Sequence, residues 1–367
     1  MSADTAPQKV GTTHVASLDG LRFFAFLVVF LFHALQSNAR LSRFSAYGAL
    51  GVQVFFVLSG FLIGGILLDL RRRSTWALGG RLRVFYARRS LRIFPLYYMT
   101  LIALLLLELV GLDAVGGSDV FFWNASYLTN VKFFLDGEMN GGLSHLWSLA
   151  VEEHFYLTVP VLVLLLSIRQ LSWLCVATWI FGGVGRAAFF LAGNDLGWVL
   201  SPLQFDCMAV GIAAAILLAE GQFLGLDLHR VLQISAVAAA AAIPLLALWQ
   251  WPSRTATTIG QVFDNFAVAT ASVGLILVLW RSTSPFLART FTIGPLPYLG
   301  RISYGLYIFH LPCLVLVSEY LDFLPIGQMI PSFALTVGLA ALSWRFVEAP
   351  ANRLKPRYPQ AGAPARC

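Results

Sequence analysis

The stretch SLDGLRFFAFLVVFLFHA, residues 17–34, is an apolar segment long enough to cross a membrane, yet it contains an arginine and a histidine. A helix of about 20 apolar residues spans the hydrocarbon core of a bilayer. Ionisable side chains inside such a helix are energetically costly, so they usually face a cavity or a partner and mark a functional site. Arg22 and His33 are therefore the first candidates for function.

The composition excludes an ordinary soluble domain. Of the 367 residues, 58% are hydrophobic and only 12% are charged, whereas the charged share of a soluble domain is about 25%. The net charge of +7 fits the excess of Lys and Arg in cytoplasmic loops of membrane proteins, so no nucleic-acid partner is expected. The sequence predicts an all-α fold, a polytopic transmembrane helix bundle in the lipid bilayer.

We count about ten apolar stretches that could each form a membrane-spanning helix. They are residues 18–37, 48–69, 94–112, 147–168, 172–191, 202–220, 230–249, 259–280, 298–318 and 328–347.

Positive charge is distributed unevenly between the connections, which predicts an orientation. With the chain starting inside, the outer connections hold Arg40, Arg43, Lys132, Arg186 and Arg254. The loop between the second and third spans holds Arg71, Arg72, Arg73, Arg81, Arg83, Arg88, Arg89 and Arg92. Both termini are therefore expected in the cytoplasm.

The chain reads as one membrane domain, residues 17–354, between flexible cytoplasmic tails at 1–16 and 355–367. A signal peptide is the competing reading of the start, but its cleavage would discard Arg22 and His33. Cys175, Cys207 and Cys313 lie in apolar spans and are expected as small buried hydrophobes. The histidines show no metal-binding spacing, so no metal site is expected. No pattern indicates an oligomeric state.

Arg22 and His33 project from nearly the same helix face, because eleven residues make about three turns and separate them by about 16 Å. Asp19 can pair with Arg22 from one turn earlier. His33 is expected around or slightly beyond the bilayer midplane. Alternatively, Arg22 is an interfacial anchor that extends to the headgroups, and His33 is a packed, hydrogen-bonded side chain.

Further polar residues occur in three other apolar segments. In HLWSLAVEEHFYL (145–157) the spacing places His145, Glu152 and Tyr156 on one helix face, with Glu153 slightly round the helix. The other two segments are GRISYGLYIFH (300–310) and LQFDCMAVG (203–211). Because burial is too costly for each group to face lipid separately, we expect one polar cavity near the membrane centre. Its further candidates are Asp206, Tyr307 and His310.

The order of these motifs resembles that of the acyltransferase-3 family of integral membrane O-acyltransferases. The motifs are Arg22-x10-His33 after LDGL, GVQVFFVLSGFLIG (51–64), RRSLRIFPLYY (88–98), HLWSLAVEEHFYL (145–157), ISYGLYIFH (302–310) and WRFVEAPANRL (344–354). The resemblance implies ten helices, a multi-pass location in a bacterial inner membrane, and transfer of an acyl group, most commonly acetyl. The donor would be cytoplasmic acyl-CoA, and the acceptor a hydroxyl of a saccharide, glycolipid or macrolide.

The sequence also departs from the family pattern at three positions. His154 stands where glutamine is usual, Gln204 where arginine often precedes FD, and Ala349 where ERP is more usual than EAP. The first departure could alter acceptor contacts. Some members carry an additional extracytoplasmic hydrolase-like domain, which is not expected here.

Acyl transfer to an alcohol needs a base, and His33 is our candidate. Glu152 or Glu153 could fix its tautomer, and a tyrosine or an arginine such as Arg22 could support the thioester oxyanion. An acyl-histidine intermediate stays open.

Acyl-CoA is expected as a co-substrate and not as a permanently bound cofactor. Arg89 and Arg92, with Arg88 beside them, could hold the CoA phosphates. The positive-inside bias alone would also fill this loop with arginine.

Two other functions use the same residues. A proton-coupled multi-pass transporter would also place His, Glu and Arg in the membrane, although no inverted repeat is visible. A catalytically silent scaffold or receptor would not need to keep every reactive residue.

Overall fold

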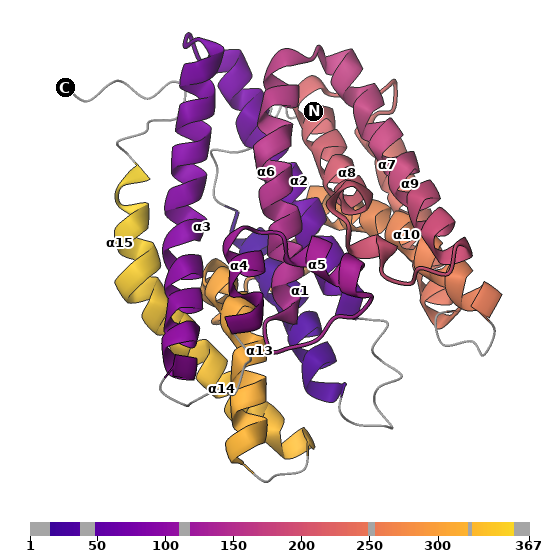
Figure 1. Ribbon diagram of the computed structural model, residues 1–367. Coiled ribbons are helices and arrows are strands. Elements are labelled where there is room, and N and C mark those ends of the chain that lie inside the picture. Colours follow the sequence, from indigo (N-terminus) through magenta and orange to yellow (C-terminus); the bar gives the residue numbers. More distant parts are fainter. Residues whose placement is uncertain (1–14, 37–47, 110–117, 249–253, 322–324, 356–367) are drawn as a thin grey trace.

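The computed structural model describes residues 15–36, 48–109, 118–248, 254–321 and 325–355, and these form a bundle of helices without a named strand (Figure 1). This confirms the predicted all-α bundle. The long helices are α1 (Ala16–Leu35), α2 (Gly48–Arg73), α3 (Leu78–Leu109), α6 (Trp147–Leu165), α7 (Ile168–Leu191), α8 (Ser201–Glu220), α9 (Leu228–Leu248), α10 (Arg254–Arg281), α13 (Ser303–Tyr320) and α14 (Pro325–Ser343).

Short helices lie in the connections and at the end of the described chain. They are α4 (Ser118–Ala125), α5 (Thr129–Asp136), η2 (Ser144–Leu146), η3 (Gly197–Val199), α11 (Pro285–Thr290), α12 (Leu296–Arg301), η4 (Trp344–Glu348) and α15 (Ala349–Asn352). In Figure 1, α7 to α10 lie together on the right of α6, whereas α13 to α15 lie on the side of α3. The predicted tails fall almost wholly outside the described residues, as does Cys367.

Eight helices of the described chain are long and apolar enough to cross a membrane. The helix α9, Leu228–Leu248, is also apolar over most of its length, whereas α13 carries polar residues along its length. The count of ten spans and the orientation of the termini therefore remain predictions. Cys175, Cys207 and Cys313 are buried free thiols, as predicted.

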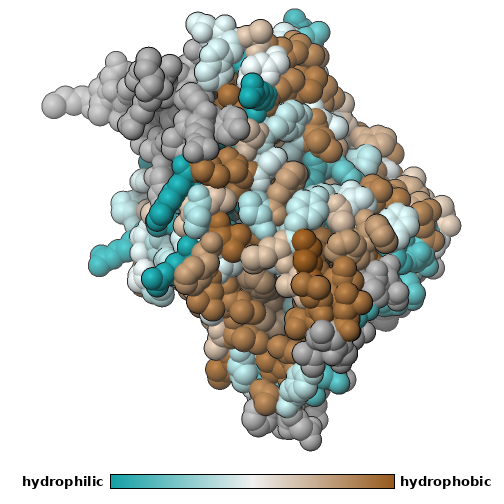
Figure 2. Space-filling model, turned by 60° about the vertical axis from the view of Figure 1, so that its left-hand side comes forward, coloured by the Kyte–Doolittle hydropathy of each residue, from teal (hydrophilic) through white to brown (hydrophobic). Residues whose placement is uncertain are grey.

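Large apolar side chains remain exposed on the outside of the bundle, as a bilayer requires. Leu109 of α3, Leu191 of α7 and Ile330 of α14 are each more than 70% exposed, at 73%, 83% and 79%. Figure 2 shows hydrophobic residues over much of the middle and lower part of one face, with hydrophilic residues along its left edge, at its top and on its right-hand side.

The placement of Arg186 in an outer connection is wrong. Arg186 lies within α7 and is 1% exposed. The predicted span 172–191 already includes this arginine. Counting Arg186 also as a residue of an outer connection was therefore inconsistent with that span.

Two glycines permit the close helix crossings that position the cavity. A Cβ atom at Gly60 of α2 would lie 1.9 Å from the Met208 carbonyl oxygen of α8, and one at Gly300 of α12 would lie 1.7 Å from the Asp19 carbonyl oxygen of α1. Real Cβ contacts are never this short, so any larger residue would push the helices apart. The second crossing fixes the first turns of α1, where Arg22 begins the polar face.

Arginines at the end of α2 bind the ends of neighbouring helices. Arg71 donates to the Val163 carbonyl oxygen at 3.1 Å, near the end of α6. Arg72 forms an ion pair with Glu220 at 2.5 Å, at the end of α8. The last carbonyl groups of a helix lack partners within it and carry partial negative charge, so these arginines act as caps.

Candidate active site

A cavity of about 240 Å³ lies between α1, α2, α3, α6 and α13. On α2 its lining extends from Val52 to Ile66, which corresponds to about 21 Å along the helix axis. The cavity is therefore elongated and follows most of the predicted membrane thickness. Its polar lining consists of Arg22, Ser59, Arg89, Arg92, Ser148, Glu152, Glu153, Tyr156, Ser303, Tyr304 and Tyr307.

Glu152 is held by hydroxyl groups from two helices. Ser59 donates to Glu152 Oε1 at 2.6 Å, and Tyr156 donates to Oε2 at 3.2 Å. The Arg89 guanidinium lies over the Tyr156 ring, 5.2 Å from its centroid. Glu153 lies beside this cluster, and its Oε1 atom is buried without a hydrogen-bond partner among the described residues. The predicted shared face of Glu152 and Tyr156 is thus present.

Arg22 pairs with Asp19 as predicted, with Nη1 and Oδ1 2.6 Å apart. Because Asp19 offsets one positive charge, Arg22 is held at the cavity wall by a local partner. Arg89 and Arg92 reach the same cavity from α3. Three guanidinium groups and two carboxylates from three helices therefore converge on one elongated cavity.

Arg88, Arg89 and Arg92 of α3 form a basic cluster, and Lys355, which follows the last predicted span, extends it. Arg88 donates to the Lys355 carbonyl oxygen at 3.1 Å. Burial, together with the positive charges of Arg92, Arg89 and Arg88, lowers the pKa of the Lys355 ammonium group from its ordinary value to about 7. Four cationic side chains packed this closely repel one another, so the cluster favours a polyanionic ligand.

His33 lies in the last turn of α1, nearer the helix end than the midplane position expected from the sequence. Its ring centroid is 5.2 Å from that of His310, and the His310 centroid is 4.7 Å from that of His145. We call His33, His310 and His145 the histidine cluster. They do not form a group that could hold a metal ion among the described residues.

The histidine cluster meets the cavity at Tyr307 and Ser148. Their hydroxyl oxygens are 2.6 Å apart, and both line the cavity. Tyr307 donates to the His145 carbonyl oxygen at 3.2 Å, and its ring centroid is 5.3 Å from that of His310. The structure thus brings the three histidines together, but His33 lies against His310, whereas Glu152 is held by Ser59 and Tyr156.

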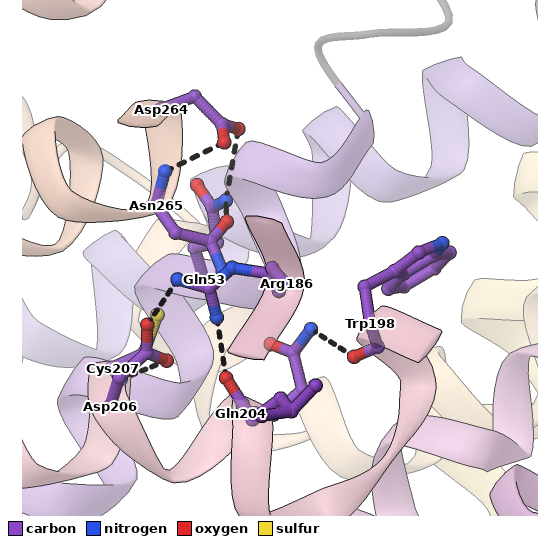
Figure 3. A network of polar contacts seen from close by, with 9 residues as sticks. Gln53, Arg186, Trp198, Gln204, Asp206, Cys207, Asp264 and Asn265 are labelled. Carbon is purple, nitrogen blue, oxygen red and sulfur yellow. Dashed lines mark hydrogen bonds and ion pairs between the residues drawn. The ribbon is translucent and has the colours of Figure 1, made fainter. Parts of the chain in front are cut away.

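Asp206 lies in a network of polar contacts (Figure 3), and it is buried, with 1% of its surface exposed. Arg186 Nη2 is 2.5 Å from Asp206 Oδ2. Gln53 of α2 donates to Asp264 Oδ2 at 3.2 Å and bonds Asn265, both on α10. This network joins α2, α7, α8 and α10, and its residues are absent from the cavity lining.

Sequence reasoning missed most of this network. Arg186 and Asp264 were visible as lone charges inside the apolar stretches 172–191 and 259–280, which is the same signal that singled out His33. Their pairing across helices could not be predicted without knowing which helices pack together.

Two departures from the family pattern have partners outside the cavity. The His154 Nδ1 atom is 2.6 Å from the Ser201 hydroxyl oxygen at the start of α8. Gln204 donates to the Trp198 carbonyl oxygen at 2.8 Å. Both residues therefore support the packing of α8 and are not part of the cavity lining.

Comparison with known proteins gives a consistent result. A family model described as an acyltransferase domain matches residues 15–345. The chain is 26% identical to the peptidoglycan O-acetyltransferase OatA of Listeria monocytogenes, over 93% of the chain and 56% of that protein. It is also 26% identical to the O-acetyltransferase OatA of Staphylococcus aureus, over 93% of the chain and 57% of that protein. The chain thus spans just over half the length of these relatives. No solved structure matches it significantly.

Proposed function

We propose that this chain, which belongs to the acyltransferase family and is a multi-pass bacterial membrane protein, transfers an acetyl group from acetyl-CoA to a glycan hydroxyl. The family and the names of the relatives support O-acetyl transfer, and the Listeria relative points to a glycan of the peptidoglycan type. The observation that carries the proposal is the elongated cavity, because it joins a cluster of cations to buried carboxylates and hydroxyls inside a membrane bundle.

The donor enters from the end of the cavity that carries the basic cluster. CoA bears a 3′-phosphate and a pyrophosphate, and guanidinium groups bind phosphates by paired, charge-assisted hydrogen bonds. Arg89 and Arg92 point into the cavity from α3, while Arg71 and Arg72 are engaged at helix ends. The phosphate contacts are therefore assigned to Arg89 and Arg92, with Arg88 and Lys355 beside them.

The acceptor hydroxyl approaches from the opposite end, where His33 acts as the base. The hydroxyl attacks the thioester carbon while His33 removes its proton, a contribution of about 100-fold to 10,000-fold in rate. Val29, one turn before His33, packs where a side chain on Gly51 would be, next to Val52 at the cavity end. His33 is absent from the cavity lining, and the contact of Val29 supports a position for His33 near the Val52 end.

The carboxylates have a different role from the one first expected. Glu152 holds the Tyr156 hydroxyl and lies near Arg89, so it orients the groups at the donor end of the cavity. A tyrosine hydroxyl or the Arg22 guanidinium donates to the oxyanion as the tetrahedral intermediate forms. The free Oε1 atom of Glu153 accepts a hydrogen bond from a substrate hydroxyl or amide.

Purified protein in proteoliposomes tests this function directly. With acetyl-CoA and a panel of soluble peptidoglycan fragments, we expect release of free CoA thiol together with glycan that is heavier by one acetyl group. Thiol release without acetylated glycan, or no thiol release with any acceptor, would contradict the proposal. Proteoliposomes that receive no acetyl-CoA and vesicles that contain no protein serve as controls.

The variants Arg89→Gln and Arg92→Gln should weaken donor use selectively. Removing phosphate contacts lowers binding of substrate and transition state alike, so the KM for acetyl-CoA should rise about 10-fold or more while kcat changes less. Arg72→Gln is the matched control, because Arg72 binds Glu220 outside the cavity. An unchanged KM in both cavity variants would assign these arginines to membrane topology alone.

CoA binding should weaken as the pH rises through about 7. The pKa of free Lys355 is about 7, so its charge is present below that pH and is lost above it. A bound polyanion raises this pKa, and linkage then requires that the protonated form binds CoA more tightly. The Kd for CoA, measured by equilibrium binding from about pH 6 to pH 8.5, should increase in the wild type and change less in Lys355→Gln. Identical profiles would exclude Lys355 from the donor site.

A further inference from the structure

The lining of the cavity becomes apolar along α2 in the direction of Val52. Ser59 marks the donor end, because it holds Glu152, and Glu152 lies near Arg89. Phe55 and Val52 line the cavity one and two turns earlier on the same helix, since residues three or four positions apart share a helix face. The axial distance from Ser59 to Val52 is about 10 Å. We call the part of the cavity lined by Phe55 and Val52 the apolar end.

Two hydroxyl groups at the apolar end are already engaged with other protein atoms. The hydroxyl oxygens of Ser148 and Tyr307 are 2.6 Å apart. Both hydroxyls also lie within hydrogen-bond distance of the His145 carbonyl oxygen, at 3.1 Å and 3.2 Å. Leu149, next to Ser148 on α6, adds an apolar side chain to the lining. The walls at this end therefore offer a bound group mainly carbon surface.

Phe55 presents a ring to the apolar end that is fixed by packing. Its centroid is 6.0 Å from that of Tyr307 on α13, at an interplanar angle of 74°. Phe55 also packs against an apolar cluster that contains Phe26 and Phe30 of α1. Phe55 is half-buried, whereas its neighbour Phe56 is only 1% exposed. Because it is packed against two other helices, the Phe55 ring cannot move aside without losing these contacts.

The acyl group of a bound donor reaches the apolar end. The arm between the pyrophosphate and the sulfur of CoA is as long as about four extended residues, or about 14 Å. With the phosphates held by Arg89 and Arg92, an arm of this length places the thioester beside Phe55 or Val52. In the other direction the cavity leads to Ile66, toward the arginine-rich end of α2 from which the donor enters.

We infer that Phe55 limits the length of the acyl group that this chain transfers, an inference that rests on the proposed function. The methyl group of an acetyl donor fits beside the ring, whereas each further methylene meets it. The covalent step is the same for every acyl group: the ester C–O bond forms, the C–S bond breaks, and the acceptor proton ends on the CoA sulfur. Phe55 therefore determines donor specificity by excluding longer acyl groups.

The variants Phe55→Leu and Phe55→Ala test this inference in proteoliposomes with acetyl-CoA, propionyl-CoA, butyryl-CoA and the fragment that the wild type acetylates. One methylene changes kcat/KM by about 10-fold or more, so the wild type should use butyryl-CoA about 100-fold less well than acetyl-CoA. The ratio of the two kcat/KM values should rise about 10-fold in Phe55→Leu and about 100-fold in Phe55→Ala. Propionyl-CoA should fall between them.

The matched control is Phe61→Leu, on the same helix. Phe61 is 0% exposed, packs against Trp280 and is absent from the cavity lining, so its variant should keep the wild-type ratio. The ratio is measured within one protein and does not depend on the fraction that folds. Binding of free CoA, which has no acyl group, should be the same in the wild type and both Phe55 variants.

Two results would overturn the inference and leave acetyl transfer intact. One is a wild type that uses butyryl-CoA as well as acetyl-CoA, and the other is an unchanged ratio in the Phe55 variants. A wild type that makes no acetylated fragment would instead overturn the proposed function, and the role of Phe55 with it.

Discussion

His33→Ala should abolish acetyl transfer while the protein still inserts into the membrane and binds CoA. The variant removes the proposed base, and general base catalysis contributes about 100-fold to 10,000-fold in rate. The proposed phosphate contacts, Arg89 and Arg92, are on α3 and are not touched, so the loss should appear in kcat and not in the Kd for CoA. Single-turnover acetylation and equilibrium CoA binding measure the two effects separately.

The control for this variant is Leu35→Ala, which truncates a half-buried apolar side chain in the same final turn of α1. It should retain wild-type kcat and show whether that turn tolerates substitution. Near-normal acetylation by a well-folded His33→Ala protein would remove His33 as the base. The role would then move to His310, the neighbouring ring with a free nitrogen.

Arg186→Met should destabilise the protein strongly without entering the cavity. The variant leaves the Asp206 carboxylate buried and unpaired in a network that connects four helices. Breaking a buried ion pair in this way costs about 3 to 5 kcal/mol. A large decrease in the unfolding temperature of the detergent-solubilised protein is the expected measurement.

A double variant separates the cost of the lost charge from the cost of lost packing. Arg186→Met with Asp206→Leu removes both charges and should recover much of the stability, because no unpaired charge remains. Arg72→Gln breaks an exposed pair with Glu220 and should change stability by about 1 kcal/mol or less. If Arg186→Met were no more destabilising than Arg72→Gln, the network in Figure 3 would have no structural role.

The sequence predicted the helix bundle because hydrophobic stretches long enough to cross a membrane are strong local signals. It also predicted that Glu152, Glu153, Tyr156 and Tyr307 would share a cavity, and the structure brings these four together with Arg22. The reason is general: several polar groups inside a membrane are much cheaper to bury in one place than separately.

The same reasoning did not predict which side chains Asp206 and His33 contact within the membrane. Asp206 was placed in the cavity because it is polar and buried, but its partner is Arg186 on the adjacent helix α7. His33 was expected beside a glutamate, yet its ring lies against His310. Both outcomes depend on which helix faces pack together, which periodicity within one helix does not determine.

The sidedness of the reaction tests the central claim, that donor and acceptor meet in one cavity from opposite faces. Proteoliposomes with uniformly oriented protein are supplied with acetyl-CoA and a membrane-impermeant peptidoglycan fragment in all four combinations of sides. We predict acetylation when acetyl-CoA is on the face that carries Arg88 and Lys355 and the fragment is on the opposite face. Acetylation only when both are on the arginine-rich face would contradict the account, because the cavity would then open to one side alone.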